Sequence, residues 1–514
     1  YISDYNKFVM EEKMDKNILD CLERTEKTYS NKLAFVDNKR EITYKELLEN
    51  SKRIGTYLST NEKNQPIAIF IDKTVSCLET MFGVLYSGNF YTVIDTKSPM
   101  ERINLILNTL EPIKIITDSK NLSKLKSFGI EDNICLYEDM LNEKIDEKML
   151  NQVRRKMIDT DPMYILFTSG STGVPKGTVI AHKSVISYSN WVKETFNITS
   201  DTIWGSQTPF YFSMSITDVF STILSGATLY IIPKMYFSFP IKLLEFINEK
   251  KINTIYWVPS ALCIVANFKA LDEVELPTLK KVLFAGEVMP VKQLNMWINK
   301  LPNTMFANLF VHTETTDICT YYIVDRKFNN NENLPIGHAC NNCDVIVVKE
   351  DGTEAKDGEE GELCARGSFL ALGYYNNPEK TASVFVQNPL NKNYSEIVYK
   401  TGDIVKYNER GELIYLSRKD FQIKHMGYRI ELGEIETAVN NIDGIIICAC
   451  VYDTENSKIV LFYQGDEIEE NELLEQVKNK VPAYMCPNQI IKLPRIPYNA
   501  NGKIDRVNLK NMLK

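Results

Sequence analysis

Short apolar runs alternate with amphipathic stretches through most of the chain. Each run has the length of one buried strand, and the stretches between them, such as residues 241–250, repeat apolar residues at helical spacing. The runs that predict strands are residues 66–71, 91–95, 114–118, 227–233, 254–259 and 281–287. Strands that alternate with helices predict a large α/β domain of layered, mostly parallel sheets. In such sheets the ligand binds at the carboxyl ends of the strands.

The pattern changes beyond Leu416, where the polar residues 418–420 form a junction. The junction is followed by a glycine-containing loop, a helix pattern at residues 434–441, strand patterns at residues 445–452 and 458–464, a further helix pattern and a lysine-bearing tail. This order predicts a separate, small α+β domain of ordinary size. We therefore expect a large domain over residues 1–418 and a small, mobile domain over residues 419–514.

The composition is that of a globular protein and excludes several classes of function. The chain has 514 residues, of which 44% are hydrophobic and 25% are charged, so it is long enough for two folded units. A net charge of -8 argues against binding to the nucleic-acid backbone. The sequence shows neither an apolar run of membrane-spanning length nor a signal-peptide pattern, and its cysteines are scattered. We therefore expect a cytoplasmic protein without nucleic-acid or membrane partners.

A loop rich in glycine and hydroxyl residues follows the apolar run at residues 164–167. This phosphate loop, residues 168–177, contains Thr168, Ser169, Gly170, Ser171, Thr172 and Gly173, followed by Lys176. Glycines let successive N–H groups point at one anion, hydroxyls add donors, and the lysine adds a mobile positive charge. The loop predicts a polyphosphate site, although its spacing is not that of the usual P-loop. A flexible surface loop is the alternative, but it does not explain so many donors directly after a buried strand.

Further motifs of polar and glycine residues are distributed along the chain. They are, in order, ITYKEL at residues 42–47, the stretch at residues 85–95, the phosphate loop, AGE at residues 285–287, TETT at residues 313–316, GELCARG at residues 361–367, YKTGD at residues 399–403, KDFQIKHMGYRIELGEIE at residues 419–436 and NANGKIDR at residues 499–506. Over nearly its whole length, the chain resembles the adenylate-forming superfamily. It looks most like the adenylation domains of nonribosomal peptide synthetases and the D-alanine–carrier protein ligases.

The resemblance implies an ATP-dependent enzyme that converts a carboxylic acid to an acyl-adenylate and releases pyrophosphate. The acyl group then passes to the phosphopantetheine thiol of a carrier protein. No carrier-domain serine motif is evident in the chain, so we expect the carrier on another polypeptide or beyond the end of this sequence. Both reactants of the first step are anionic, and charge neutralisation and alignment therefore supply most of the catalysis.

The resemblance also implies roles for individual residues. In the catalytic group, Lys503 bridges the carboxylate, ribose and phosphate oxygens, Thr313 contacts the α-phosphate, Glu314 binds Mg²⁺, and Lys176 acts from the phosphate loop. In the nucleotide site, Asp403 holds the ribose hydroxyls with help from Arg418, and Phe310 covers the adenine beside Gly286, Glu287 and Asn308. Taken singly, a lysine in a tail is usually solvated and an aspartate after glycine usually belongs to a turn. Their ordered combination favours the functional interpretation.

The acid pocket is implied by the same resemblance. It comprises Phe212, Ser213, Met214, Thr217, Tyr256, Leu283, Ala285, Leu309, Asp317 and Ile318. Amino-acid-activating relatives usually have an aspartate in place of Ser213, which binds the α-ammonium group. Because a hydroxyl does not replace a carboxylate as the partner of a buried cation, the acid either lacks an α-amino group or carries its amine elsewhere. In the second case Asp317 receives the amine; the alternative is that Asp317 faces solvent or pairs locally.

Val311 and His312 stand where relatives usually have glycine and proline. The valine side chain occupies space that a glycine leaves to the ligand. His312 either contacts phosphate or substrate, or packs beside the site without a role in it.

The resemblance further implies that the small domain rotates about Asp420 between two half-reactions. Lys503 acts in the first; in the second it withdraws, and the loop containing Gly427 approaches to open a tunnel for the phosphopantetheine arm. Two other functions stay open: an acyl- or aryl-CoA ligase, which shares the nucleotide motifs, and a catalytically weak nucleotide-binding homologue, suggested by Val311 and His312. The run at residues 424–436 favours the carrier-loading enzyme.

Overall fold

The computed structural model describes residues 15–60, 62–170, 173–330, 332–419, 422–465, 468–498 and 504–513. Four residues to which the sequence assigned a role, Ser171, Thr172, Asp420 and Lys503, lie outside the described residues. In the described part, no helix combines the length and the apolar character needed to cross a membrane.

The largest sheet within the described ranges has nine strands in the order β15-β14-β13-β12-β11-β9-β10-β1-β2. These strands are β15 (His338–Ala339), β14 (Ile318–Ile323), β13 (Met305–Val311), β12 (Lys281–Ala285), β11 (Thr254–Trp257), β9 (Ile203–Ser206), β10 (Thr228–Ile231), β1 (Leu33–Val36) and β2 (Glu41–Thr43). From β13 to β1 all neighbours are parallel, and the pairs at both edges are antiparallel. The expected strands at residues 227–233, 254–259 and 281–287 are confirmed as β10, β11 and β12.

A second sheet carries the phosphate loop and has the order β18-β8-β7-β4-β3-β5-β6. Its strands are β18 (Gly373–Tyr374), β8 (Lys176–Ala181), β7 (Pro162–Thr168), β4 (Phe90–Val93), β3 (Pro66–Phe70), β5 (Lys114–Thr117) and β6 (Ile134–Leu136). The strands from β7 to β6 are parallel, whereas β7 and β8 form an antiparallel hairpin. The phosphate loop is the connection of this hairpin, which opposes Thr168 to Lys176.

A third, antiparallel sheet brings together motifs that lie far apart in the sequence. It consists of β16 (Cys343–Val348), β17 (Gly361–Gly367), β20 (Ile397–Tyr407) and β19 (Phe385–Gln387), with β21 (Leu413–Arg418) paired to β20. The register of β20 and β21 places Asp403 opposite Arg418.

Helices cover and separate the two large sheets. The helices before residue 400 are α2 (Ile18–Tyr29), α3 (Tyr44–Leu58), α4 (Val75–Tyr86), α5 (Met100–Leu110), α6 (Leu122–Ser127), α7 (Tyr137–Met140), α8 (Glu147–Lys156), α9 (His182–Thr195), α10 (Met214–Ser225), α11 (Pro240–Glu249), α12 (Pro259–Asn267), α13 (Ala270–Glu273), α14 (Val291–Lys300) and α15 (Pro378–Val384), with short 3-10 turns η1 (Lys234–Ser238) and η2 (Thr313–Thr315). Phe82 of α4 meets Phe220 of α10 with ring centroids 5.8 Å apart. Because α4 packs on β3 and β4 while α10 packs on β9 and β10, these helices form a layer between the sheets.

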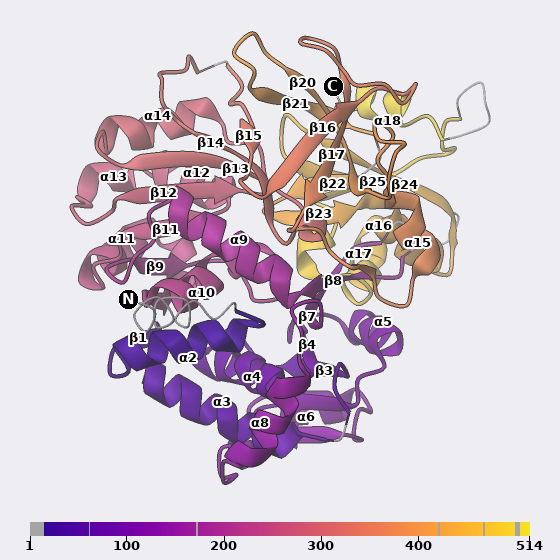
Figure 1. Ribbon diagram of the computed structural model, residues 1–514. Coiled ribbons are helices and arrows are strands. Elements are labelled where there is room, and N and C mark those ends of the chain that lie inside the picture. The colour runs from indigo at the N-terminus through magenta and orange to yellow at the C-terminus, as the bar shows by residue number, and fades with distance from the viewer. Residues whose placement is uncertain are drawn as a thin grey trace.

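The C-terminal segment, orange to yellow in Figure 1, has its own hydrophobic core. Its elements are β22 (Gln422–His425), β23 (Tyr428–Glu431), α16 (Leu432–Asn440), β24 (Ile445–Asp453), β25 (Lys458–Gly465), α17 (Glu470–Lys478), η3 (Ala483–Met485), β26 (Gln489–Lys492) and α18 (Arg506–Asn511). Ile435 of α16 packs with Leu461 and Tyr463 of β25 in that core. The expected helix and strands are confirmed, with α16 beginning at Leu432 instead of residue 434. A domain boundary at residue 418 stays a prediction.

Candidate active site

Lys176 lies buried where the phosphate loop runs into β8. Its Nζ is 3.9 Å from Glu314 Oε1, 3.6 Å from Glu431 Oε1 and 5.4 Å from the centroid of the Tyr374 ring. Burial lowers the pKa of Lys176 to about 8, so the ammonium form still prevails at pH 7. Across the hairpin, Thr168 Oγ1 is buried and has no hydrogen-bond partner among the described residues. A positive charge and an unsatisfied hydroxyl at one loop suit an anionic ligand.

Glu314 faces the phosphate loop from η2, the short turn between the antiparallel strands β13 and β14. It is fully buried; Tyr374 donates to its Oε1 at 2.7 Å, and Arg429 donates to its Oε2 at 2.6 Å. Burial alone would raise the pKa of Glu314, but Arg429 and Lys176 hold that pKa well below its ordinary value. The carboxylate of Glu314 is therefore ionised, and it stabilises the positive charges that lie next to it.

Asp403 and Arg418 meet through the register of β20 and β21. The guanidinium donates to Asp403 Oδ1 at 2.9 Å. His312 Nε2 lies 2.8 Å from Asp403 Oδ2, but the pair lacks the angle of a hydrogen bond, and neither atom has another hydrogen-bond partner within the described ranges. A buried, unsatisfied carboxylate oxygen is ready to accept a hydrogen bond from a ligand hydroxyl.

His312 is a packed residue of this region. Its ring lies between those of Phe310 and Tyr399, with centroids 5.3 and 5.8 Å away. Burial lowers the pKa of His312 to about 4, which makes the imidazole neutral at pH 7. The packing of His312 among these rings is the arrangement of the second alternative from the sequence, and a contact of His312 with phosphate or substrate stays a prediction.

The residues assigned to the adenine lie at the ends of β12 and β13, where the β22–β23 hairpin covers them. Lys424 of β22 has its Nζ 4.5 Å from the centroid of the Phe310 ring. A Cβ built on Gly286 would lie 3.6 Å from Gly427 Cα, in the turn of the hairpin. Glu287 and Asn308 are held by Ser260 N and Pro335 O, respectively. The loop containing Gly427 thus lies against the predicted adenine site, and its role in the second half-reaction stays a prediction.

Asp317 is fully buried and is held by hydroxyl groups from three elements. Ser213 donates to its Oδ1 at 2.9 Å; the Oδ2 lies 3.1 Å from Tyr188 OH, 3.0 Å from Thr217 Oγ1 and 3.0 Å from Tyr256 OH. Burial raises the pKa of Asp317 to about 6, against the effect of these hydrogen bonds. The alternative that Asp317 faces solvent is wrong, because the side chain is enclosed; its local pairing is with hydroxyl groups.

The remaining residues predicted for the acid pocket come from the elements that neighbour Asp317. Met214 belongs to α10, Leu283 and Ala285 to β12, Leu309 to β13 and Ile318 to β14, and all are buried. Phe212 packs edge-on against Tyr428 of the hairpin, with ring centroids 4.9 Å apart. Since β11, β12, β13 and β14 are consecutive in the sheet, the fold brings the predicted pocket residues to one region.

The β22–β23 hairpin and the start of α16 use hydrogen-bonding groups of the phosphate loop. Ser169 Oγ donates to the Arg429 carbonyl at 2.8 Å and accepts from Glu431 N at 3.0 Å. Gly170 N donates to Glu434 Oε2 at 3.1 Å, and Arg102 of α5 pairs with the same glutamate. A carboxylate therefore takes a loop N–H group that suits a phosphate.

Several of these partners were not assigned a role from the sequence. Arg429, Glu431 and Glu434 lie in a motif quoted for the resemblance, and their charged side chains within that motif are the signal that was available. Tyr374 and Arg102 carry no such signal, because only the packing of β18 and α5 brings them to the site.

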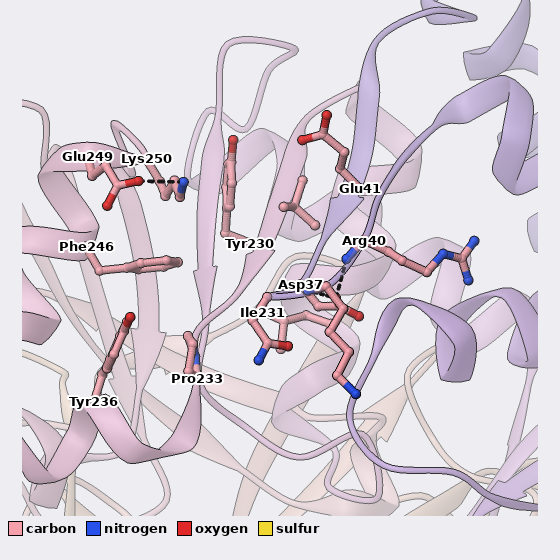
Figure 2. A pocket seen from close by; sticks show the side chains of 13 residues that line it. Asp37, Arg40, Glu41, Tyr230, Ile231, Pro233, Tyr236, Phe246, Glu249 and Lys250 are labelled. Atoms are coloured by element: carbon pink, nitrogen blue, oxygen red, sulfur yellow. Dashed lines mark hydrogen bonds and ion pairs between the residues drawn. The ribbon is translucent and has the colours of Figure 1, made fainter. Parts of the chain in front are cut away.

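A cavity of about 410 Å³ lies elsewhere, beside β1, β2, β10 and α11 (Figure 2). Asp37, Arg40, Tyr230 and Phe246 line it, and the Glu249–Lys250 ion pair lies on its wall. Of the described residues that line this cavity, none was assigned to the nucleotide or acid site. The convergence of charged groups, and not the volume of this cavity, therefore identifies the candidate site.

Comparisons with known proteins show which family and which solved fold this chain resembles. The AMP-binding enzyme family matches residues 22–375. Zwittermicin A synthase ZmaJ of Bacillus cereus is 29% identical over 92% of this chain and 91% of that protein. A D-alanine–D-alanyl carrier protein ligase of Lacticaseibacillus casei is 29% identical over 96% of this chain and 98% of the ligase. The solved Vibrio cholerae adenylation domain AlmE, in complex with glycyl-adenosine-5'-phosphate, shares the fold with a TM-score of 0.83, at 22% identity and over 98% of both chains.

Proposed function

The chain belongs to the AMP-binding enzyme family, and from this premise we propose that it is an AMP-forming acid–thiol ligase that loads a carrier protein. A carboxylate oxygen of the acid bonds to the α-phosphorus of ATP, and pyrophosphate leaves with the electrons of the broken P–O bond. A phosphopantetheine sulfur then attacks the acyl carbon, and AMP leaves. The similarity to a D-alanine–D-alanyl carrier protein ligase supports a carrier as the acceptor.

The convergence of Lys176, Glu314 and the Asp403–Arg418 pair on one region is the observation that carries the proposal. We assign the phosphates to the phosphate loop and Lys176, and the ribose hydroxyls to Asp403, whose Oδ2 is buried and unsatisfied within the described residues. These groups are fixed by strands before the substrate arrives, so they stabilise developing charge without reorganisation.

We assign magnesium to Glu314. The ionised, buried carboxylate fits this role, because Mg²⁺ commonly uses one or two carboxylates together with substrate phosphates. When bound, the ion would neutralise charge on the phosphates. In the described arrangement Arg429 takes the position of a cation at Glu314 Oε2, so Arg429 must withdraw when the metal binds.

We further propose that the acid carries an amino group. Asp317 is a buried carboxylate whose described hydrogen-bond partners are all hydroxyl groups, and no cationic side chain pairs with it in the described part of the chain. Ser213, which replaces the usual α-amine aspartate, donates directly to Asp317. An ammonium group that enters beside Ser213 therefore gains the charge partner that the carboxylate lacks.

The proposed function is tested by acid-dependent ATP–pyrophosphate exchange, measured across amino, hydroxy, aryl and fatty acids. Exchange that depends on an amino-bearing acid is expected. Thioester formation is then measured with a phosphopantetheinylated carrier and with free coenzyme A. Transfer to coenzyme A alone would identify an acyl-CoA ligase, and the absence of exchange with every acid would identify a nucleotide-binding homologue without this activity.

Asp317→Asn is expected to lower kcat/KM for the amino-bearing acid about a hundredfold, since a buried cation loses its charge partner. Thr217→Val is the matched control; it removes one hydroxyl but leaves the carboxylate, and we expect only a severalfold loss. The ATP–pyrophosphate exchange rates of both variants are compared with the rate of the unmodified protein. Equal activity of Asp317→Asn and the unmodified protein on every amino-bearing acid would exclude Asp317 as the amine partner.

The activity on an amino-bearing acid is expected to rise with pH through about pH 6. Burial raises the pKa of Asp317 to about 6, and the protonated form, present below that pH, cannot pair with an ammonium group. A profile of kcat/KM against pH reports this ionisation in the free enzyme. The limb near pH 6 should vanish in Asp317→Asn; its persistence there would assign the ionisation to another group.

A further inference from the structure

A second cavity, of about 230 Å³, opens next to the phosphate loop. Its walls come from β8, β17, α15, β20, β21 and the β22–β23 hairpin. Lys176 belongs to this wall and also to the phosphate loop, so the cavity and the loop share one ammonium group. We call it the cationic cavity.

Cationic side chains dominate the wall. Those among its described lining residues are Lys176, Lys380, Lys400, Arg418, Lys419 and Arg429, against the two carboxylates Glu362 and Glu431. Cationic groups held together in a concave wall create a strong positive potential that attracts an anion of high charge.

Arg418 and Arg429 are paired with Asp403 and Glu314, but the carboxylates near this wall are still fewer than its cations. Lys400 and Lys419 share Glu362, at 3.4 and 3.6 Å, and Lys380 has no ion-pair partner within the described ranges. Lys176 lies no closer than 3.6 Å to a carboxylate oxygen. The cavity therefore keeps positive charge that an entering anion would neutralise.

The phosphate loop itself is engaged in this arrangement. Ser169 Oγ bonds to the hairpin backbone, and Gly170 N donates to Glu434. A phosphate group that leaves the loop as the hairpin closes meets the same ammonium of Lys176 from the cavity side. Lys380 of α15 and Lys400 of β20, which shares Glu362 with Lys419, line the same wall.

We propose that the cationic cavity binds a polyphosphate anion, inorganic pyrophosphate, while the hairpin covers the phosphate loop. This inference rests on the proposed function, because pyrophosphate is the product of the first half-reaction. The cavity thus receives the product after the carboxylate of Glu434 has replaced it at Gly170 N. Lys380 and Lys400 are its specific ligands, and neither belongs to the site described above.

Calorimetric titration of the full chain with pyrophosphate, without ATP or acid, tests the proposal. Lys380→Ala and Lys400→Ala are each expected to weaken Kd about tenfold, and the double variant about a hundredfold, since each removes one charge-assisted contact. Lys406→Ala is the matched control: it removes a lysine of the same strand β20 that does not line the cavity, and it should change Kd less than twofold. Lys400→Arg should retain binding.

Unchanged pyrophosphate affinity in Lys380→Ala and Lys400→Ala would overturn the proposal, as would an equal loss in Lys406→Ala. Tripolyphosphate and orthophosphate are titrated in parallel, and an equal affinity for orthophosphate would overturn the assignment to a polyphosphate. The proposed function is judged separately by exchange activity. If the enzyme is active but its pyrophosphate affinity is the same with and without both lysines, only the cavity proposal is refuted. If the chain is inactive but its pyrophosphate binding depends on the lysines, only the proposed function is refuted.

Discussion

Glu314→Gln is expected to lower the rate of acyl-adenylate formation about a thousandfold. The substitution keeps the shape of the side chain but removes the charge that faces the buried Lys176 and the partly buried Arg429. It also removes the negative charge with which we propose that Glu314 binds Mg²⁺. Loss of one partner from a buried charge cluster costs about 3–5 kcal/mol in free energy of unfolding, so thermal unfolding is measured alongside ATP–pyrophosphate exchange.

Tyr374→Phe is the control for Glu314→Gln. It removes the hydroxyl that donates to Glu314 Oε1 at 2.7 Å but leaves the carboxylate charged, and we expect a loss of less than about tenfold. A large loss in Tyr374→Phe with a small one in Glu314→Gln would mean that the hydroxyl, and not the carboxylate, serves the reaction.

Lys503→Ala is expected to separate the two half-reactions. We propose that Lys503 acts only in adenylation, so the variant should form acyl-adenylate about a thousandfold more slowly yet transfer a supplied acyl-adenylate to the carrier within about twofold of the normal rate. Lys510→Ala, on an exposed position of the nearby helix α18, is the control and should leave both rates unchanged. Equal loss of both half-reactions in Lys503→Ala would contradict the proposal.

Glu434→Gln tests the separation of the two half-reactions from the other side, because it is expected to slow acyl transfer and not adenylation. Glu434 accepts from Gly170 N and pairs with Arg102, and these contacts hold the C-terminal segment on the phosphate loop. Without its charge the described arrangement is less stable, so transfer should slow about tenfold while adenylation is unaffected or faster. A slower first half-reaction in this variant would place Glu434 in the wrong step.

Patterns along the chain predicted the elements that carry the phosphate loop and the acid pocket. A buried strand in a parallel sheet is apolar on both faces, so the runs that became β3, β10, β11 and β12 stand out in the sequence. Element ends were less certain, as with α16, which begins at Leu432 because the hairpin runs directly into the helix. The motif order, and not periodicity, predicted the family.

The hydrogen-bond partners of the buried charged groups could not be predicted from the pattern of hydrophobic and polar residues. Tyr188 reaches Asp317 from α9, more than a hundred residues earlier in the chain, through the packing of α9 on α10. Tyr374 reaches Glu314 because β18 pairs with β8. Hydroxyl groups are common and carry no periodic signal, so only the tertiary fold identifies those that contact a buried carboxylate. The assignments of Lys503 and Asp420 stay predictions.

The N–H of Gly170 donates to Glu434 in the described arrangement. We therefore expect the rate of the enzyme to depend on the concentration of its substrate ATP in an unusual way. One proton cannot serve a glutamate and a nucleotide phosphate at once, so each occupant excludes the other by mass action. We propose that the described arrangement, with Glu434 on Gly170 N, is the one that transfers the acyl group. Raising ATP far beyond saturation should then lower its population, and turnover is expected to decline at the highest nucleotide concentrations. A cell that kept ATP at an intermediate level would obtain the fastest throughput from this ligase.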